Sequence, residues 1–584
     1  MRVLILDGHC AAATEAAQSL GRQGASVDVA SEMPDCLVFR SRYVASRLNQ
    51  PPSDPPDAFF LWLRQRHAER RYEFIVPSTD VSLVLLRRLE EDDPLRLRAV
   101  LPGDAALDVA IDKIATCRLA ERLGIPVPHS IIIPRGNPAP QCVRYPAVLK
   151  SSRSRVAVDG RSVRLEAQVV RDAGERERVL AGWLQHTDVQ QQDFVTGRGF
   201  GIEMLFDRGR MLWYFAHERL HEMPMTGGGS CYRRSIQPPP ELLSAAERLL
   251  RELAWHGVAM VEFRGHAPRF HLMEINPRLW GSLALAIDAG VDFPAGLATI
   301  ATGGALPPQP QYRVPYYTRQ LISDVQWHKE NLRADRRDPL LLTRPRLRSA
   351  LEMLRPLAGR ESWDFFDWRD LGVIGRHLRQ IIAWEAGRLL LRLTRLRART
   401  RARSHHRRLT RAMAARGGPG ELLFVCHGNI CRSPVAAKVA ERELSAAHVR
   451  SAGLHRLEHR ASPQHVRRAA LAAGVSLEVH RSRRMTAADA EQAGLILCMD
   501  TENLDMFRRE FPDAYERATL LGLFADPPCL DIPDPLNASD AVTGDVIELI
   551  SRAVLGLKAW MRELSTPGSD RAPSTAPNSP KAAR

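Results

Sequence analysis

The most constraining feature of this sequence is the segment Cys426–Pro434, which reads Cys-His-Gly-Asn-Ile-Cys-Arg-Ser-Pro. It follows the apolar run Leu422–Val425 and precedes a helical pattern over Val435–Leu444, which predicts a buried strand, a tight loop and a helix. In such a junction the N–H groups of the loop and of the first helical turn converge and favour an anion. Because Cys426 and Arg432 bracket the loop, the sequence predicts a phosphate cradle that holds a nucleophilic thiolate.

Further residues fit the same chemistry. Arg432 offers a planar guanidinium that grips two phosphate oxygens, and Asn429 suits a left-handed backbone position in the loop. A phosphate ester also needs a proton for its leaving oxygen, and Asp531 and Asp534 lie on a proline-stiffened loop, Leu530–Pro535. We expect one of these carboxylates to act first as general acid on the leaving oxygen and then as general base on water.

These segments resemble the low-molecular-weight protein tyrosine phosphatases over about residues 421–564, and Ser451-Ala-Gly and the run from Ile496 to Asp500 also match that family. The resemblance implies a doubly wound parallel sheet, a metal-free reaction through a cysteinyl-phosphate on Cys426, and Asp534 as the acid. Besides Cys426 and Arg432, the positions it implies for the phosphate-binding loop are His427, Gly428, Asn429, Ile430, Cys431 and Ser433, with Ser451 and His480 as supports.

The same region departs from the family pattern at one position and argues against a neighbouring activity. Many members carry an aromatic residue just after the Asp-Pro pair, where this chain has Leu536, which bears on how broadly phosphotyrosine is recognised. Arsenate reductases share the fold but need two more cysteines on a mobile segment, and Arg481–Gln492 has none. Cys431 lies inside the loop, where a reversible disulfide with Cys426 would protect the nucleophile from over-oxidation. The alternative, that Cys426 is only a buried thiol, does not account for so many matching segments.

A second site is indicated by the segment Met260–Arg278, in which two apolar strands flank a turn near Gly265–Pro268. Antiparallel pairing places Glu262 about opposite Glu274 on one face, where like charges repel. A divalent cation held by both carboxylates and by the Asn276 oxygen would neutralise them, and such hard oxygen ligands suit Mg²⁺ or Mn²⁺. The alternative is a solvated hairpin face, which explains the following Asn-Pro-Arg less well.

Residues around this hairpin fit a nucleotide. Lys113 and Lys150 supply point charges for ATP phosphates, and the alternative for either lysine alone is a solvated surface charge. Arg278 lies within reach of a phosphate or acyl-phosphate oxygen. The end of a predicted strand offers backbone groups that would read the adenine edge, and the residues singled out there are Gln192, Asp193 and Val195.

These pieces resemble the ATP-grasp superfamily, in its carbamoyl-phosphate-synthase-like branch, over about residues 1–305. The matching segments are Asp112-Lys113, Gly124–Pro128, Pro146–Lys150 and Glu274–Arg278. The resemblance implies ATP and Mg²⁺ or Mn²⁺ as cofactors, and a ligase that joins an unidentified carboxylate to an unidentified acceptor, such as an amine, through an acyl-phosphate. It assigns Glu262, Glu274 and Asn276 to the metal, and Lys113, Lys150, Asp193 and Val195 to ATP.

The loop after Lys150 differs from the family. Ser151–Arg155 contains no glycine, so the cover over the phosphates would have to come from side chains, and Gly227–Gly229 is a second candidate lid over the acid substrate. This departure motivates an alternative from another class of function. In that alternative the N-terminal region is a non-catalytic nucleotide-sensing module that regulates the phosphatase.

The organisation predicted for the chain is multidomain α/β, since 584 residues at about 150 per domain suggest about four units. The start of the chain lacks a full dinucleotide-type glycine fingerprint, which argues against a nicotinamide cofactor. The predicted parts are a pre-ATP-grasp α/β domain at 1–105, an ATP-grasp α+β domain at 106–310, a basic helical linker at 311–420, a doubly wound phosphatase domain at 421–564 and a disordered tail at 565–584. A hinge is expected at Gly417–Gly420.

The net charge of +15 is concentrated in one stretch, because Ala386–Arg416 contains eleven arginines and no acidic residue. The rest of the chain is nearly balanced, so we expect no specific nucleic acid partner. A basic helix over Leu378–Arg403 suggests contact with an anionic membrane surface or an acidic partner through residues 378–416. The alternative, which we favour, is a solvated linker that packs one apolar stripe against a neighbour.

The compartment expected from the sequence is the cytoplasm, with a peripheral membrane location if the basic helix binds lipid. The opening MRVLILDG meets an acidic residue too early for a signal peptide, and Phe293–Tyr312 is too interrupted for a membrane span. Nine scattered cysteines do not form a disulfide framework. The expected partner is a phosphotyrosine protein, and on resemblance alone a polysaccharide-export tyrosine kinase is one hypothesis.

Overall fold

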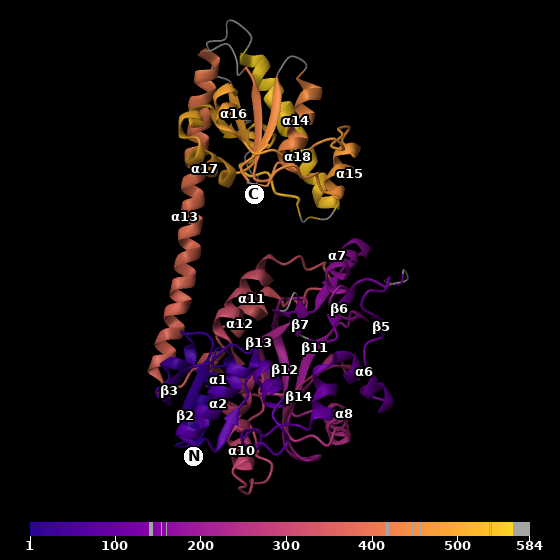
Figure 1. Cartoon of the computed structure of the whole chain (residues 1–584), viewed down its shortest axis with the longest axis vertical. Coiled ribbons are helices and arrows are strands. Elements are labelled where there is room, and N and C mark those ends of the chain that lie inside the picture. Colours follow the sequence, from indigo (N-terminus) through magenta and orange to yellow (C-terminus); the bar gives the residue numbers. More distant parts are fainter. Residues whose placement is uncertain are drawn as a thin grey trace. The chain divides into compact units, whose positions relative to one another are not determined.

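The computed structural model describes residues 1–564 except positions 139, 141–143, 154, 159–160, 416–419, 445–447, 456, 537 and 539. The chain forms two compact units, Met1–Ala383 and Trp384–Arg584, each with sheets and a core of its own (Figure 1). The helix α13 (Leu371–Ala415) begins in the first unit and ends in the second. The tail expected at 565–584 and most of the hinge expected at Gly417–Gly420 lie outside the described residues.

The first unit opens with a parallel four-stranded sheet in the order β3-β2-β1-β4. Val3 and Ile5 pack into one apolar cluster and Leu4 and Leu6 into another, so both faces of the sheet are covered. The strands are β1 (Arg2–Ile5), β2 (Ser26–Ser31), β3 (Val44–Asn49) and β4 (Phe74–Val76), and the helices are α1 (Ala11–Arg22), α2 (Pro56–Arg70), α3 (Asp80–Leu86) and α4 (Pro94–Leu97).

A second, antiparallel sheet has the order β5-β10-β6-β9 and carries α7 against one side. Its small core joins Leu149, Val189 and Leu180. The strands are β5 (Ser130–Ile133), β6 (Ala147–Ser151), β9 (Gln168–Val170) and β10 (Val189–Asp193); the helices are α5 (Asp104–Ile111), α6 (Lys113–Arg122) and α7 (Ala173–Trp183); and β7 (Arg155–Val158) pairs with β8 (Arg161–Arg164).

The largest sheet has seven strands in the order β15-β14-β11-β12-β13-β16-β17. Leu205 and Trp213 pack with α1, α9 and α10 on one face, and Ile202 and Met204 pack with α8 on the other. The strands are β11 (Arg198–Asp207), β12 (Arg210–Met223), β13 (Gly229–Ser235), β14 (Gly257–His266), β15 (Arg269–Asn276), β16 (Tyr317–Arg319) and β17 (Glu361–Trp363), and the helices are α8 (Pro240–Glu252), α9 (Leu283–Ala289), α10 (Phe293–Ala301), α11 (Leu321–Arg333) and α12 (Arg346–Glu352).

The region expected to begin a linker at residue 311 is instead folded into this sheet. β16 pairs with β13 and β17 pairs with β16, so residues up to the start of α13 belong to the first unit. Strands of three residues carry too short a pattern to recognise, and this part of the core is polar: Arg319 is 4% exposed and Asp324 is fully buried. The helix at the end of the linker is real but longer than Leu378–Arg403. The divisions at residues 105 and 420 stay predictions.

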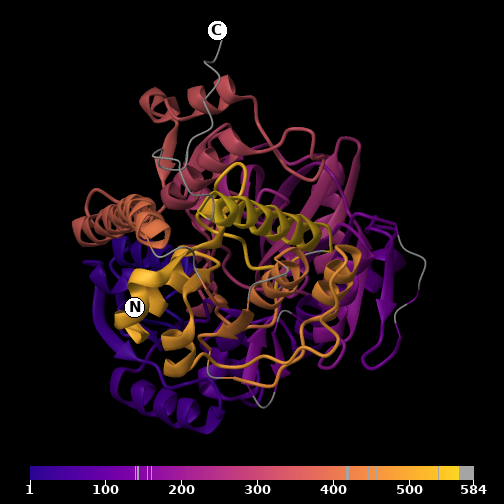
Figure 2. The ribbon, with the colours of Figure 1, turned by 90° about the horizontal axis from the view of Figure 1, so that it is seen from above.

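The second unit is a doubly wound parallel sheet in the order β19-β18-β20-β21, as the sequence predicts. Phe424 packs into a cluster with α14, α15 and α18, and Val425 packs into a cluster with α16 and α17 on the other face (Figure 1). The strands are β18 (Leu422–Cys426), β19 (Val449–Gly453), β20 (Leu495–Cys498) and β21 (Ala518–Leu520), and the helices are α14 (Arg432–Glu443), α15 (Gln464–Ala472), α16 (Ala487–Gln492), α17 (Thr501–Glu510) and α18 (Asp540–Leu564), the long yellow helix of Figure 2.

The C-terminal end of α13 is built into the second unit. Leu409 and Met413 join the cluster of Phe424, and the His405 ring stacks on Tyr515 with centroids 4.5 Å apart. Among the described residues no single helix is both long and apolar enough to cross a membrane, and one bent pair, α9 with α10, meets the criteria by length and composition.

Candidate functional sites

The loop after β18 is organised around Asn429, which has a left-handed backbone with φ of 50°. The Asn429 backbone N–H donates to the Cys426 Sγ at 3.2 Å. Its side-chain amide donates to the hydroxyls of Ser433 and Ser451, at 3.0 Å each. The Cys426 Sγ also lies 3.0 Å from the Ser433 hydroxyl, so loop and helix groups surround the sulfur.

Two supports of this loop come from a distant segment. His480 places Nε2 2.8 Å from the Asn429 carbonyl oxygen, and the backbone N–H of Arg483 donates to the Asn429 side-chain oxygen at 3.0 Å. The sequence gives no sign of the role of Arg483, since a backbone contact has no residue-type signal. Gly453 explains the Ser-Ala-Gly segment, because a Cβ there would lie 3.0 Å from the backbone and Cβ of Asn429.

The Arg432 guanidinium at the start of α14 meets two carboxylates. Its Nη2 donates to Asp534 at 2.8 Å, and its Nη1 donates to Asp500 at 2.5 Å and to the Ile532 carbonyl oxygen at 3.0 Å. The other candidate acid, Asp531, instead accepts from the backbone and hydroxyl of Thr501 at 2.8 Å each. Of the two candidate acids, Asp531 and Asp534, only Asp534 therefore faces the loop.

Residues of the loop and Asp534 line a cavity of about 250 Å³. Its lining consists of Cys426, His427, Gly428, Ile430, Cys431, His455, Arg460, Asp534 and Leu536. Arg460, which the sequence analysis did not single out, donates to the Gly428 carbonyl oxygen at 3.1 Å. Burial, with Asp534 and Cys426 nearby, raises the pKa of the Cys431 thiol to about 12.

In the first unit the structure brings the two glutamates of the hairpin together. Glu262 on β14 pairs with Glu274 on β15, and the Asn276 amide donates to both carboxylates at 3.0 and 3.4 Å. Arg219 on β12 was not among the predicted residues: its guanidinium lies 2.6 Å from Glu262, and only 11% of its side chain is exposed. Lys113 lies 3.9 Å from Glu274.

The pKa values of the two glutamates are shifted in opposite directions. Burial, partly offset by Arg219, raises the pKa of Glu262. Burial also acts on Glu274, but Lys113 and Lys150 outweigh it and its pKa is lowered. Burial lowers the pKa of Lys150, although the negative charge of Glu274 acts to raise it. Cations and carboxylates from β6, α6, β14 and β15 thus converge on one place.

This donor set suits Mg²⁺ in kind, because two carboxylates and an amide offer hard oxygen ligands. Glu262 Oε1 is already shared between Arg219 and Asn276, so a cation there would have to compete with a guanidinium. A partly buried carboxylate pair with this composition can hold either a metal ion or a fixed side-chain cation.

The remaining nucleotide candidates are more dispersed. Gln192 places its amide nitrogen 3.7 Å from the Cys117 Sγ, and the Asp193 backbone N–H donates to the His129 carbonyl oxygen at 2.9 Å. Val195 follows β10 and is half-buried. Arg278 forms an ion pair with Asp80 of α3 at 2.8 Å. Its reach to a phosphate oxygen stays a prediction.

Comparison with known proteins agrees with both resemblances. Residues 421–566 match the model "Low molecular weight phosphotyrosine protein phosphatase", and residues 192–326 match "ATP-grasp in the biosynthetic pathway with Ter operon". The low molecular weight protein-tyrosine-phosphatase Etp of Escherichia coli (strain K12) is 33% identical over 144 residues, which cover 25% of this chain and 94% of Etp.

Two further matches are a curated relative and a solved structure. A protein-arginine-phosphatase of Geobacillus stearothermophilus is 33% identical over 120 residues, 20% of this chain and 80% of that protein. A crystal structure of an L-amino acid ligase from Bacillus licheniformis matches 53% of this chain and 75% of its own, with 14% identity and a TM-score of 0.41. Through its C-terminal part this chain belongs to the low molecular weight phosphotyrosine protein phosphatase family, and an ATP-grasp domain precedes that part in the same polypeptide.

Proposed function

We propose that residues 421–564 hydrolyse the aryl phosphate of phosphotyrosine proteins through a covalent intermediate on Cys426. The Cys426 thiolate attacks phosphorus, the P–O ester bond breaks, and Asp534 gives its proton to the leaving phenolate oxygen. Asp534 then takes a proton from a water molecule, which attacks the cysteinyl-phosphate and releases inorganic phosphate and the thiolate. Each step uses side chains of this chain, so the proposal needs no metal ion.

The observation that carries this proposal is the convergence of three groups on one cavity. Cys426 and Asp534 line it, and the Arg432 guanidinium contacts Asp534 at 2.8 Å. A phosphoryl group bound over the sulfur would replace Asp534 on part of that guanidinium, because a dianion competes well with one carboxylate for a planar fork of donors. The released carboxyl group then lies beside the ester oxygen that it must protonate.

The cavity favours an aryl ester over a phosphoguanidine. Ile430 and Leu536 offer apolar surface to a phenyl ring, and Asp534 is the only acidic residue among the described residues that line the cavity. A positively charged guanidine group would need a further carboxylate partner. The similarity to a protein-arginine-phosphatase makes phosphoarginine the substrate to compare.

The test is hydrolysis of phosphotyrosine and phosphoarginine peptides, with and without a chelator. Cys426→Ser should abolish turnover, whereas Cys498→Ser should retain it, because Cys498 is a fully buried thiol of β20 that does not line the cavity. The proposal expects faster turnover of the phosphotyrosine peptide and no effect of the chelator. Full activity of Cys426→Ser, or a preference for phosphoarginine, would contradict it.

For the ATP-grasp domain we propose an ATP- and Mg²⁺-dependent ligase that joins a carboxylate to an amine. Support comes from the gathering of Lys113, Lys150, Glu262 and Glu274, in which charges of both signs face one place. Mg²⁺ held by the carboxylates would supply charge neutralisation for the nucleotide phosphates. The lysines would orient those phosphates and stabilise the charge that moves during phosphoryl transfer.

The alternative, a nucleotide sensor that regulates the phosphatase, is favoured by one contact. The Arg219 guanidinium neutralises Glu262 from the place where a catalytic metal ion would bind. ADP release by the Cys426→Ser protein with Mg²⁺ and pooled carboxylates and amines separates the two functions, with Glu274→Ala as control. Release that needs an acid and vanishes in the control supports the ligase, and ATP binding without release supports the sensor.

We further propose domain divisions at residues 105 and 420 and a cytoplasmic location. The eight described cysteines are free thiols, which suits a reducing compartment. A membrane or acidic partner for residues 378–416 has little further support, because most side chains between 384 and 403 lie outside the described residues.

A further inference from the structure

A second hollow, of about 40 Å³, lies over the seven-stranded sheet of the first unit. It is lined by Arg198, Leu220, Arg234, Tyr317, Arg348, Glu352 and Arg355, which we call the arginine pocket. Glu218, Arg234 and Tyr317 form one cross-strand row, and Glu262 belongs to the neighbouring row. Because adjacent residues of a strand point to opposite faces, the arginine pocket and the candidate ATP site are on opposite faces of the sheet.

The charges around the arginine pocket do not balance. Glu218 is shared by two arginines, since it pairs with Arg198 and lies 2.6 Å from Arg234. Glu352 lies 3.7 Å from Arg348. Counting Arg344, which reaches the Leu220 carbonyl oxygen at 3.5 Å, five guanidinium groups share two carboxylates.

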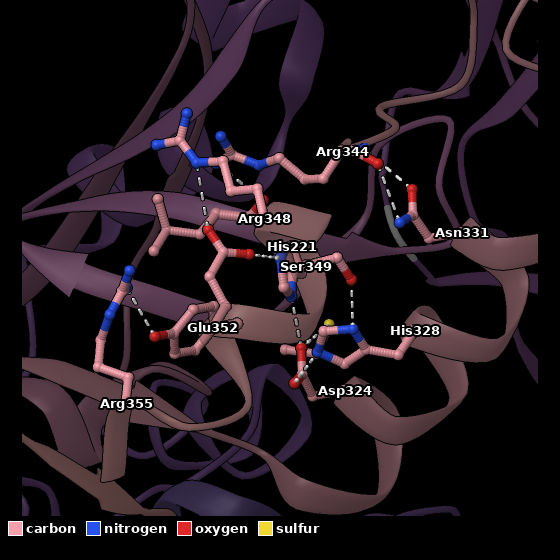
Figure 3. A network of polar contacts seen from close by, with 12 residues as sticks. His221, Asp324, His328, Asn331, Arg344, Arg348, Ser349, Glu352 and Arg355 are labelled. Atoms are coloured by element: carbon pink, nitrogen blue, oxygen red, sulfur yellow. Dashed lines mark hydrogen bonds and ion pairs between the residues drawn. The ribbon is translucent and has the colours of Figure 1, made fainter. Parts of the chain in front are cut away.

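Arg344 responds to this excess of positive charge. Burial and the positive fields of Arg198 and Arg348 lower its pKa. Figure 3 shows the guanidinium groups of Arg344 and Arg348 close together at one side of the network. An anion between these groups would relieve their repulsion, and guanidinium groups form strong, charge-assisted hydrogen bonds with oxyanions.

The far wall of the arginine pocket is held in place by a buried network (Figure 3). His221 of β12 presents one ring nitrogen to Glu352 of α12 at 3.0 Å and the other to Asp324 of α11 at 2.6 Å. The His221 ring stacks on Trp327 with centroids 3.5 Å apart and an interplanar angle of 6°. Since Glu352 is fixed in this way, the helix that carries Arg348 is anchored to the sheet.

Arg355 is positioned by two further contacts at the edge of that network. Its Nη1 donates to the Tyr232 hydroxyl at 2.8 Å, and its guanidinium lies over the Tyr317 ring, 4.2 Å from the centroid. Both contacts leave donors of the guanidinium available, because a guanidinium carries five N–H groups. The cationic groups of the arginine pocket are therefore largely pre-positioned before any ligand binds.

The nearby cluster of His221, Asp324 and His328 stabilises the fold and is not a second metal site. Asp324 is contacted by His221, by His328 at 3.3 Å and by Arg319. Burial works against ionisation of Asp324, but hydrogen bonds from His221 and His328 outweigh it and the pKa is well below its usual value. The positive charge of Arg319 on the same carboxylate makes a metal cation unfavourable there.

We propose that the arginine pocket binds a phosphate-type oxyanion, either free phosphate or the phosphoryl group of a small metabolite. Guanidinium groups reach it from β11, β13, α12 and the turn after α12, so they surround a ligand from several sides, as a tetrahedral anion requires. A volume of about 40 Å³ holds one such group and leaves any further part of the ligand outside. The two negative charges of a phosphate dianion would offset most of the excess positive charge of the arginine pocket.

The test measures the number of phosphate sites on the full chain by equilibrium dialysis with inorganic phosphate. The variant Arg348→Gln/Arg355→Gln should lose one site or weaken it at least about tenfold, since each lost charge-assisted hydrogen bond is worth about 1.5–3 kcal/mol. The matched control is Arg346→Gln, because Arg346 lies on the same helix and contacts the Leu332 carbonyl oxygen outside the arginine pocket. The wild type and both variants keep the phosphatase loop and the ATP site. Phosphate bound at those two sites therefore does not contribute to the difference between the proteins.

A second measurement does not depend on substitutions. A crystal of the full chain soaked in tungstate should show an anomalous peak between Arg348, Arg355 and Arg234. Glycerol phosphate that competes as well as inorganic phosphate would identify a phosphoryl group as the ligand, and competition by inorganic phosphate alone would identify the free anion. An unchanged number of sites with no peak, or an equal loss in Arg346→Gln, would overturn the proposal.

Discussion

The guanidinium of Arg432 donates to the carboxylate of Asp534 at 2.8 Å, so the residue expected to bind phosphate and the residue expected to protonate the leaving group are joined directly. Arg432 is almost fully buried, whereas 46% of the Asp534 side chain is exposed. Asp534 is therefore the member of the pair that has room to move. Substrate binding and release of the general acid are expected to be one event.

Asp534→Asn should slow turnover by about 10²- to 10⁴-fold, because the amide cannot transfer a proton to the leaving oxygen. The loss should be larger for phenyl phosphate than for p-nitrophenyl phosphate, since a nitrophenolate leaves without protonation. The control is Asp531→Asn, which weakens contacts to Thr501 but leaves Asp534 in place. Equal losses for both esters, or the same effect of Asp531→Asn, would argue against Asp534 as the acid.

Asn429 has two separable roles, its left-handed backbone and its side-chain hydrogen bonds. Asn429→Gly keeps the positive φ and loses the contacts to Ser433, Ser451 and Arg483, whereas Asn429→Ala loses both. We expect the alanine variant to be less stable than the glycine variant by about 1–2 kcal/mol, and both to have reduced kcat. Thermal unfolding and steady-state kinetics of the two proteins measure this difference, and equal stability would show that backbone strain is unimportant.

Glu15 makes the stability of the first unit depend on pH. It lies in α1, accepts from the Phe365 backbone at 2.8 Å, and burial together with Asp364 and Asp288 raises its pKa to about 8. The folded state therefore keeps a proton that the unfolded chain loses near pH 4.3, and the free energy of unfolding falls as pH rises from about 4.3 to about 8.

Glu15→Gln should flatten this dependence, because the amide oxygen still accepts from Phe365 and carries no charge. Glu15 alone changes the free energy of unfolding by at most about 1.4 kcal/mol per pH unit. Burial raises the pKa of Asp288 to about 6, so Asp288 adds a further decrease below pH 6. Melting temperatures from pH 5 to 8.5 provide the measurement, with exposed Glu69→Gln as control. The same slope in Glu15→Gln and the wild type would show that Glu15 is ionised throughout.

The parts of both sites that the sequence predicted are local in the chain. Cys426, Asn429 and Arg432 lie on one strand–loop–helix junction, and Glu262 and Glu274 face each other across one hairpin. In each case the spacing of a few residues determines which side chains meet. The structure places these groups together as expected.

The contacts that the sequence did not predict join distant segments. Arg483 reaches Asn429 through a backbone N–H, Arg219 reaches Glu262 from a neighbouring strand, and Arg460 crosses to Gly428. Short strands such as β16 were missed for a related reason, since three residues show no period and their neighbours are buried charges. Long-range pairing is decided by packing, which a single sequence does not display.

Arg219 offers the sharpest test of whether the ATP-grasp domain holds a metal ion. Arg219→Met removes the cation beside Glu262 and leaves two facing carboxylates in a partly buried site, which should lower the stability in metal-free buffer by about 1–3 kcal/mol. If Glu262 and Glu274 can ligate Mg²⁺, added Mg²⁺ should then raise the melting temperature more in this variant than in the wild type. The double variant Arg219→Met/Glu262→Gln removes one of the facing charges, so it should recover stability and lose the Mg²⁺ response. A destabilised Arg219→Met protein whose melting temperature does not respond to Mg²⁺ would show that the glutamates serve a fixed side-chain cation, which would favour the nucleotide-sensor alternative.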